Sequence, residues 1–335
     1  MYAFAFGSYG STFLPDTARG IASHVLMSGV IVGVAVLNMF SARLIAAAED
    51  YIVGAKVLIL CAFVVAALLD ADLAAIEPAE WASPVSLVSG GMLIFVAYEG
   101  FELIANSAGD VRSPSTTIPR ALYTSVIFTI VLYMLVAVVA VGLLSLSEIA
   151  SSADFALAAA ARVVWGGVGF NLIVVAALLS TASAINATLY GTSRLTVVIA
   201  IDGELPSELE RTIAGRPVVG LLITAVASLL IANLIPLSAI SSLASAGFLI
   251  IFTCTNAANV RMADRTDSRR WLSQVGVVVC AGALVALVVH IATTRPSDLV
   301  LLAGLLAITI IGEVTYQHRV ALFDRRTATT AKPSG

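Results

Sequence analysis

Nine apolar runs of about 20 residues divide most of this chain and constrain its fold more than any other feature. A run of this length crosses a bilayer core of about 30 Å as a single helix, because lipid offers no hydrogen-bond partner to an open backbone. The composition agrees, since 59% of the 335 residues are hydrophobic and only 12% are charged, against about 25% in a soluble chain. We therefore predict an all-α polytopic membrane protein. The nine runs are 21–41, 51–69, 86–109, 120–144, 167–193, 217–235, 238–259, 274–293 and 298–318.

The distribution of lysine and arginine predicts how these runs are oriented. When successive loops are assigned to alternate sides, only Arg19, Arg162 and Arg295 of the 18 lysines and arginines fall on one side, and fifteen fall on the other. Cytoplasmic loops carry the excess of these residues in membrane proteins. We therefore expect a multi-pass protein of the cell (plasma) membrane, in contact with membrane lipid, whose C-terminal tail is cytoplasmic.

Composition and spacing argue against several other classes of function. The net charge of −3 and the lack of a basic patch argue against a nucleic-acid partner. Cys61, Cys254 and Cys280 stand singly in apolar runs, so they have no metal-ligand spacing. No Gly-rich nucleotide loop is present, and no paired catalytic groups occur at membrane depth. We therefore expect no enzyme activity, no metal and no other cofactor.

The third complete run contains two carboxylates, Glu99 and Glu102, on either side of Gly100. Ionisable groups at membrane depth cost roughly 2.5–3.5 kcal/mol each on insertion scales, so they usually face protein or a water-filled path. The apolar stretch Val85–Tyr98 is too short to span alone. We predict a helix that breaks near Tyr98–Phe101 and turns free backbone groups toward a cavity, as in many secondary transporters. The candidate substrate-binding residues are Tyr98, Glu99, Gly100, Phe101 and Glu102.

Each of these residues also has a purely structural interpretation. Gly100 permits a backbone conformation with positive φ, but glycines also serve as close-packing residues between membrane helices. Glu102 either takes part in binding or gating, or forms a polar link to a neighbouring helix. Glu99 either favours a cationic substrate or is protonated and hydrogen-bonded to a neighbour.

A second candidate site lies in the runs 51–69 and 167–193. Lys56 follows Asp50 by six residues, which is about 9 Å along a helix. Its ammonium group either serves the transport cycle or extends to the cytoplasmic headgroups. Thr181 and Ser183, with Asn186, form a polar cluster that either faces the Lys56 region or joins two helices by hydrogen bonds.

Three blocks of this sequence resemble the amino acid–polyamine–organocation (APC) permeases. FVAYEGFELIANSAGDVRSPSTTIPRAL, at 95–122, is similar to the sixth transmembrane segment of that family and its following loop. STASAINATLYGTSRLTVVIAIDGELP, at 180–206, resembles the eighth segment. EDYIVGAKVLILCAF, at 49–63, resembles the fifth. The order, spacing and sidedness of the blocks match across essentially the whole chain.

The resemblance implies an inverted 5+5 repeat followed by two accessory spans, of which this chain carries a part. One transporter domain, 1–335, would then hold all the spans. Its expected parts are the remainder of the first repeat at 1–69, the second repeat at 86–259, two accessory spans at 274–318 and a tail at 319–335. Met1–Leu14 corresponds to the end of a third segment, so we expect the first two and a half spans, including a Gly-rich substrate-binding stretch, to be missing.

The resemblance also implies secondary active transport of an amino acid by alternating access. The backbone at Tyr98–Phe101 would meet the ammonium or carboxylate group of the substrate. Lys56 matches a family lysine that occupies the position of a coupling cation, and Thr181 and Ser183 would face it, so protons are expected partners. Two alternatives remain open, namely an amine or polyamine exchanger and a membrane fragment that does not transport.

Overall fold

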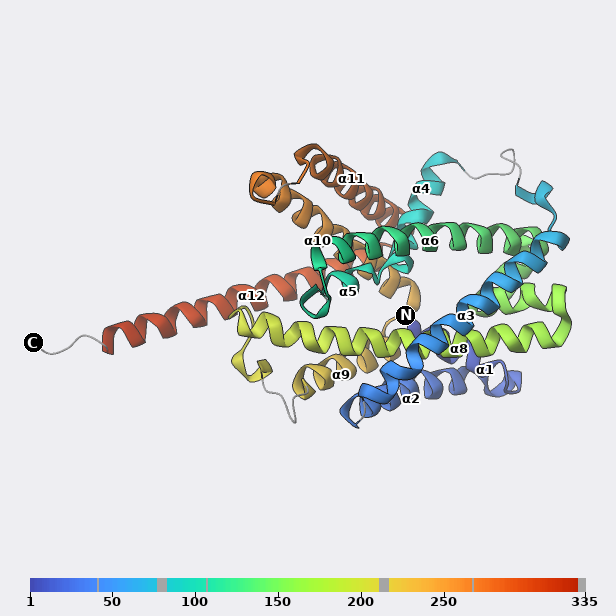
Figure 1. The fold of residues 1–335 in the computed structure, drawn as a ribbon, viewed down its shortest axis with the longest axis horizontal. Coiled ribbons are helices and arrows are strands. Elements are labelled where there is room, and N and C mark those ends of the chain that lie inside the picture. The colour runs from blue at the N-terminus through green and yellow to red at the C-terminus, as the bar shows by residue number, and fades with distance from the viewer. Residues whose placement is uncertain (41, 77–82, 107, 211–216, 267, 331–335) are drawn as a thin grey trace, which may run out of the picture. The chain divides into compact units, whose positions relative to one another are not determined.

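A computed structural model describes the chain except residues 41, 77–82, 107, 211–216, 267 and 331–335 (Figure 1). Its described residues form helices and no strand. The α-helices are α1 (Tyr2–Ser11), α2 (Arg19–Phe40), α3 (Ala42–Asp70), α4 (Pro84–Leu93), α5 (Phe101–Asn106), α6 (Pro114–Leu143), α7 (Leu146–Ser151), α8 (Ala156–Ile201), α9 (Val218–Leu234), α10 (Leu237–Thr266), α11 (Arg270–Thr294) and α12 (Pro296–Thr330). Short 3₁₀ helices are η1 (Asp16–Ala18), η2 (Leu73–Ile76), η4 (Phe95–Tyr98), η5 (Ala108–Asp110), η6 (Ala153–Phe155) and η7 (Ser207–Glu210).

Eight of the nine apolar runs are mainly α-helical in the described residues, and the run 86–109 forms helical pieces on either side of a break, which confirms the predicted all-α polytopic class. Within the part of the chain that the structure describes, seven helices are long and apolar enough to cross a membrane, and α4 with the segment after it counts as an eighth if this bent pair is one span. The remaining run forms α9, which has only 17 residues. At 1.5 Å per residue, α9 is about 26 Å long, slightly less than a bilayer core. Its end follows from Pro236, because the residue before a proline disfavours helical backbone, and Ile235 is extended.

The chain divides by its contacts into two compact units. Unit 1 comprises Met1–Pro84 and Ala97–Leu237, and unit 2 comprises Val85–Val96 and Ser238–Gly335. The boundaries expected from the inverted repeat are defined by internal symmetry, whereas these two units are defined by contacts. The repeat boundaries therefore stay a prediction.

In unit 1, α8 is the central helix and packs against α1, α2, α3 and α9 (Figure 1). Its first half shares an apolar cluster with α3 and α6, in which the fully buried Phe63 meets the edge of Trp165. Its second half shares another cluster with α1, α2 and α9, where Met27 is almost completely buried. Unit 1 is therefore built around one long helix that buries both of its halves.

The long helix α8 is interrupted at Gly166, where the backbone has φ 63° and ψ −150°. This combination is essentially restricted to glycine. The two parts of α8 approach closely beyond the break, since a Cβ atom on Gly169 would overlap the carbonyl oxygen of Ala161. The break therefore separates a first helical part, 156–165, from the part that spans.

Replacing Gly166 with alanine should lower the free energy of unfolding by about 1–3 kcal/mol, because alanine cannot adopt this backbone without strain. Gly167 is a matched control, since a Cβ atom at either glycine meets nothing within 4 Å and only Gly166 has a positive φ. Thermal unfolding of the detergent-solubilised chain measures the effect. A Gly166→Ala midpoint equal to that of Gly167→Ala would contradict the assigned backbone.

Candidate functional site

The span that carries the two glutamates is broken, as the sequence predicted. Helix α4 ends at Leu93, the 3₁₀ helix η4 follows, and α5 begins only at Phe101. Gly100, between them, has a φ of +126°. The break begins earlier than Tyr98, where the sequence placed it, because the last helical bond of α4 joins the Ile94 N–H to the Gly90 carbonyl oxygen at 3.3 Å. The irregular backbone therefore extends from Ile94 to Gly100.

Two serines of α10 satisfy backbone groups at the start of the break, within unit 2. The Ser241 hydroxyl donates to the Leu93 carbonyl oxygen at 2.7 Å. The Val96 N–H donates to the hydroxyl oxygen of the fully buried Ser245 at 3.2 Å. Ser241 and Ser245 are four residues apart, so they lie on one face of α10. These bonds explain why an open backbone is tolerated here, and neither serine was predicted, because small hydroxyl residues are common throughout membrane helices.

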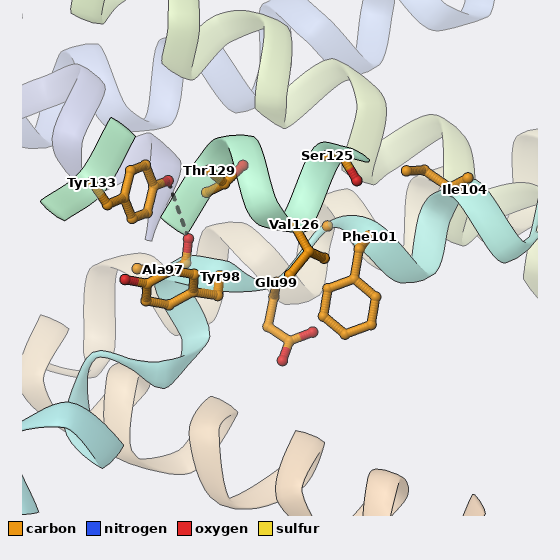
Figure 2. A pocket seen from close by; sticks show the side chains of 10 residues that line it. Ala97, Tyr98, Glu99, Phe101, Ile104, Ser125, Val126, Thr129 and Tyr133 are labelled. Atoms are coloured by element: carbon orange, nitrogen blue, oxygen red, sulfur yellow. Dashed lines mark hydrogen bonds between the residues drawn. The ribbon is translucent and has the colours of Figure 1, made fainter. Parts of the chain in front are cut away.

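A cavity of about 230 Å³ lies in unit 1 beside the second half of the break (Figure 2). Its walls come from the segment 97–104 and from the middle of α6. The volume is below the roughly 300–1,000 Å³ of sites for drug-sized ligands, so the cavity suits a small metabolite. The lining residues are Ala97, Tyr98, Glu99, Gly100, Phe101, Ile104, Ser125, Val126, Thr129 and Tyr133.

Tyr133 of α6 connects the two walls of this cavity. Its hydroxyl donates to the Ala97 carbonyl oxygen at 3.2 Å, and its ring centroid lies 5.1 Å from that of Tyr98 (Figure 2). The bond satisfies a carbonyl group that the interrupted helix leaves free. Sequence reasoning missed Tyr133, together with Ser125 and Thr129, because the run 120–144 reads as one uninterrupted apolar span.

Glu102 does not line the cavity. Its carboxylate oxygen Oε2 accepts a hydrogen bond from the Gly100 N–H at 2.7 Å. The carboxylate thus fixes the backbone at the start of α5, and this hydrogen bond joins it to its own segment rather than to a neighbouring helix. A role of Glu102 in substrate sensing stays a prediction.

Glu99 lies on the cavity wall, and its side chain extends away from α6, next to the Phe101 ring (Figure 2). Both of its carboxylate oxygens are shielded from solvent, and neither forms a hydrogen bond among the described residues. A buried polar group normally has such a partner. Glu99 is therefore the carboxylate in this region whose environment calls for a ligand or a proton.

A second cavity, of about 290 Å³, lies between α3 and α8. Lys56 of α3 and Thr181 of α8 both line it. The Lys56 Nζ lies 3.5 Å from the Ser183 hydroxyl oxygen, to which it donates. The Thr181 hydroxyl donates to the Ala177 carbonyl of its own helix at 2.7 Å. The structure therefore brings together the three residues that the sequence proposed for coupling. The two cavities have no lining residue in common.

Asn186, the fourth member of the polar cluster, contacts a different helix. Its side-chain oxygen accepts a hydrogen bond of 2.7 Å from Asn38 of α2. Asn38 is only 7% exposed and also donates to the Val34 carbonyl oxygen at 3.0 Å. Sequence reasoning missed Asn38, which stands alone near the end of an apolar run. Ser183 and Asn186 thus link α8 to α3 and to α2 on one face.

The chain belongs to the amino acid permease family, whose model matches residues 1–312. Membership agrees with the APC resemblance seen in the three sequence blocks and identifies a permease rather than an enzyme. The matched residues include all those that line the two cavities.

Two of the similar proteins have names that describe them as transporters or permeases. The chain is 28% identical to an inner membrane transport protein of Escherichia coli over 93% of its own length and 73% of the relative. It is 31% identical to an uncharacterized protein of Methanocaldococcus jannaschii over 78% of its length, which covers 60% of that relative. It is 30% identical to a branched-chain amino acid permease of Lactococcus lactis over 49% of its length and 35% of the relative.

Proposed function

We propose that this chain forms the main part of a secondary active amino acid transporter that works by alternating access and is coupled to protons. The observation that carries the proposal is the broken span of an amino acid permease, with Gly100 at a φ of +126° beside a cavity of about 230 Å³. Unwound backbone near the midplane is how many secondary transporters bind the charged ends of a substrate. The substrate-binding residues are Tyr98, Glu99, Gly100 and Phe101, with Glu102 holding the backbone at Gly100.

The proposed coupling site is the Lys56 cavity. The Lys56 ammonium group, bonded to Ser183 and beside Thr181, lies between two packed helices. Loss and gain of its proton would change the charge between α3 and α8 during each cycle. Such a change in charge can favour one of two arrangements of these helices, as alternating access requires.

The proposed location is the plasma membrane with the C-terminal tail in the cytoplasm. The excess of lysine and arginine on that side supports this orientation. A cysteine introduced at Ser334 should react with a membrane-impermeant reagent only after the cells are opened. Labelling of intact cells would reverse the topology.

Reconstitution of the 335-residue chain in proteoliposomes tests the function directly. Uptake of a radiolabelled amino acid should exceed that of empty liposomes and rise when the outside is made acidic. A protonophore should remove the rise. No uptake of any amino acid, with correctly inserted protein, would contradict transport, whereas uptake without a response to the gradient would contradict proton coupling alone.

The second candidate function is exchange of amines or polyamines. The specific observation in its favour is Glu99, because a carboxylate on the cavity wall attracts an amine that lacks a carboxylate of its own. The same proteoliposomes, loaded with an unlabelled diamine, distinguish exchange from net uptake. Acceleration of diamine entry by diamine inside the vesicle would favour the exchanger.

A further inference from the structure

Four arginines gather at the turn between α10 and α11, within unit 2. They occur in the ten residues 261–270, between the apolar runs 238–259 and 274–293. All four are exposed. Because the turn joins two helices long enough to span, the arginines lie at the level of the lipid headgroups. This arginine cluster comprises Arg261, Arg265, Arg269 and Arg270.

Most of the positive charge of the arginine cluster is not neutralised. The Arg270 Nη2 atom lies 2.8 Å from the Asp264 Oδ2 atom, which makes one ion pair. Among the residues that the structure describes, no ion pair involves Arg261, Arg265 or Arg269. The segment 261–270 holds four arginines and two aspartates, so it is positive as a whole. The turn therefore offers at least three guanidinium groups to an anion.

A network of hydrogen bonds around Asn259 orders the backbone that carries these arginines. The Asn259 Nδ2 atom donates to the hydroxyl oxygen of the buried Ser273 at 2.8 Å and so joins α10 to α11. The Asn259 Oδ1 atom accepts from the Thr266 hydroxyl at 3.0 Å and from the Ser268 hydroxyl at 3.2 Å. Because the turn is already ordered, less conformational entropy is lost when the arginines bind a ligand.

Exposed apolar side chains lie next to the arginine cluster in the sequence and indicate which anion it binds. Trp271 is 57% exposed, Leu272 is 50% exposed and Met262 is 46% exposed. Tryptophan is enriched at the membrane–water interface, where its ring lies at headgroup level. A phospholipid offers a phosphate to the arginines and acyl chains to these apolar side chains, whereas a small soluble anion offers only charge. Four arginines at one turn are also too few for the extended basic surface that binds nucleic acid.

We propose that the turn between α10 and α11 binds anionic phospholipid, with the headgroup phosphate on Arg261, Arg265 and Arg269 and an acyl chain beside Trp271. The planar guanidinium group matches the geometry of a phosphate and can bind it through two hydrogen bonds. In the proposed orientation the turn meets the cytoplasmic leaflet, whose anionic lipids attract arginines next to a spanning helix. The site goes beyond the proposed transport function, since it shares no residue with either cavity.

Quenching of Trp271 fluorescence by brominated lipids measures which lipid lies beside the turn. The chain has three tryptophans, so Trp81→Phe and Trp165→Phe leave Trp271 as the only reporter. The 335-residue chain is reconstituted in bilayers of phosphatidylcholine and phosphatidylglycerol, of which one or the other is brominated. Phosphatidylglycerol should bind beside Trp271 at least about fivefold more strongly, which is the scale of attraction of one arginine to an anionic surface. Raising the salt from about 0.1 M to 1 M shortens the screening length from about 10 Å to 3 Å and should remove most of this preference.

Replacing Arg261, Arg265 and Arg269 together with glutamine should make the two lipids equivalent at this position. Quenching by brominated phosphatidylcholine should not change, which shows that the variant is inserted with Trp271 at the same depth. The matched control is Arg295→Gln, which removes an exposed arginine from the other end of α11 and should keep the full preference. Equal binding of the two lipids by the unsubstituted cluster, or a preference that persists in the triple variant, would overturn the inference. Loss of the preference when soluble glycerophosphoglycerol is added would also overturn it, because the cluster would then bind a free phosphodiester rather than a membrane lipid.

Discussion

Replacing Gly100 with leucine should abolish substrate binding while leaving the chain inserted in the membrane. Gly100 has a φ of +126°, which side chains of L-residues rarely adopt. A Cβ atom there meets nothing within 4 Å, so the effect acts through the backbone rather than through a clash. The backbone must rotate toward negative φ, and this rotation moves the Gly100 N–H away from the Glu102 carboxylate. By this rotation the leucine variant avoids a backbone strain of about 1–3 kcal/mol at position 100.

Gly100→Ala isolates the backbone effect, because alanine adds only the Cβ atom. We expect its affinity for substrate to fall by about tenfold, which corresponds to about 1.4 kcal/mol. Gly33→Leu is the matched control, since Gly33 lies in α2 with a normal helical backbone and open space around it. Equilibrium binding of a radiolabelled amino acid measures all three. Wild-type affinity in both Gly100 variants would remove the break from the substrate site.

Replacing Lys56 with alanine should uncouple uptake from the pH gradient. The Lys56 ammonium donates to the Ser183 hydroxyl at 3.5 Å and lines a cavity of about 290 Å³. If this group carries the coupled proton, its removal leaves transport that no longer responds to an acidic outside. We expect the stimulation by the gradient to fall by about tenfold or more, equivalent to at least about 1.4 kcal/mol of coupling free energy.

Lys56→Arg distinguishes the coupling role from a headgroup contact. Arginine also reaches the headgroups, so a lysine that merely extends there would be replaced without effect. The planar guanidinium does not fit the place of a compact ammonium beside Ser183, so a coupling lysine would fail as arginine. Cys61→Ala, on the same helix but outside the cavity, should keep the full response. Wild-type dependence on the gradient in both Lys56 variants would exclude Lys56 as the proton site.

The sequence predicted the spans because their signal is contained in each segment. Eight of the nine apolar runs are mainly α-helical, because a lipid-facing helix is apolar over its whole length and can be recognised from that stretch alone. The break around Gly100 was also predictable, because its signals all lie within one short segment of the sequence. These signals are an apolar run too short to span and two glutamates close to a glycine. Its start at Ile94 was not, because it depends on Ser241 and Ser245, which lie almost 150 residues away along the chain.

The same limit applies to the polar groups that complete the two sites. Tyr133 and Asn38 gain their meaning only from partners on other helices, Ala97 and Asn186. In a single sequence each is one polar residue in an apolar run, which is a common occurrence in membrane proteins. Packing, rather than local pattern, selects which of them face a cavity.

Protection of Thr129 by substrate is the most direct test of the claim that the cavity beside the break binds the transported molecule. Thr129 lines that cavity from α6. In a chain whose three cysteines are replaced with alanine, a Thr129→Cys variant would be alkylated with and without amino acid, beside a Ser147→Cys variant in the exposed helix α7. The account predicts that substrate slows alkylation at position 129 by at least about tenfold, as expected for an occupied site, and leaves position 147 unchanged. Equal rates at position 129 with and without a substrate that the chain demonstrably binds would contradict it.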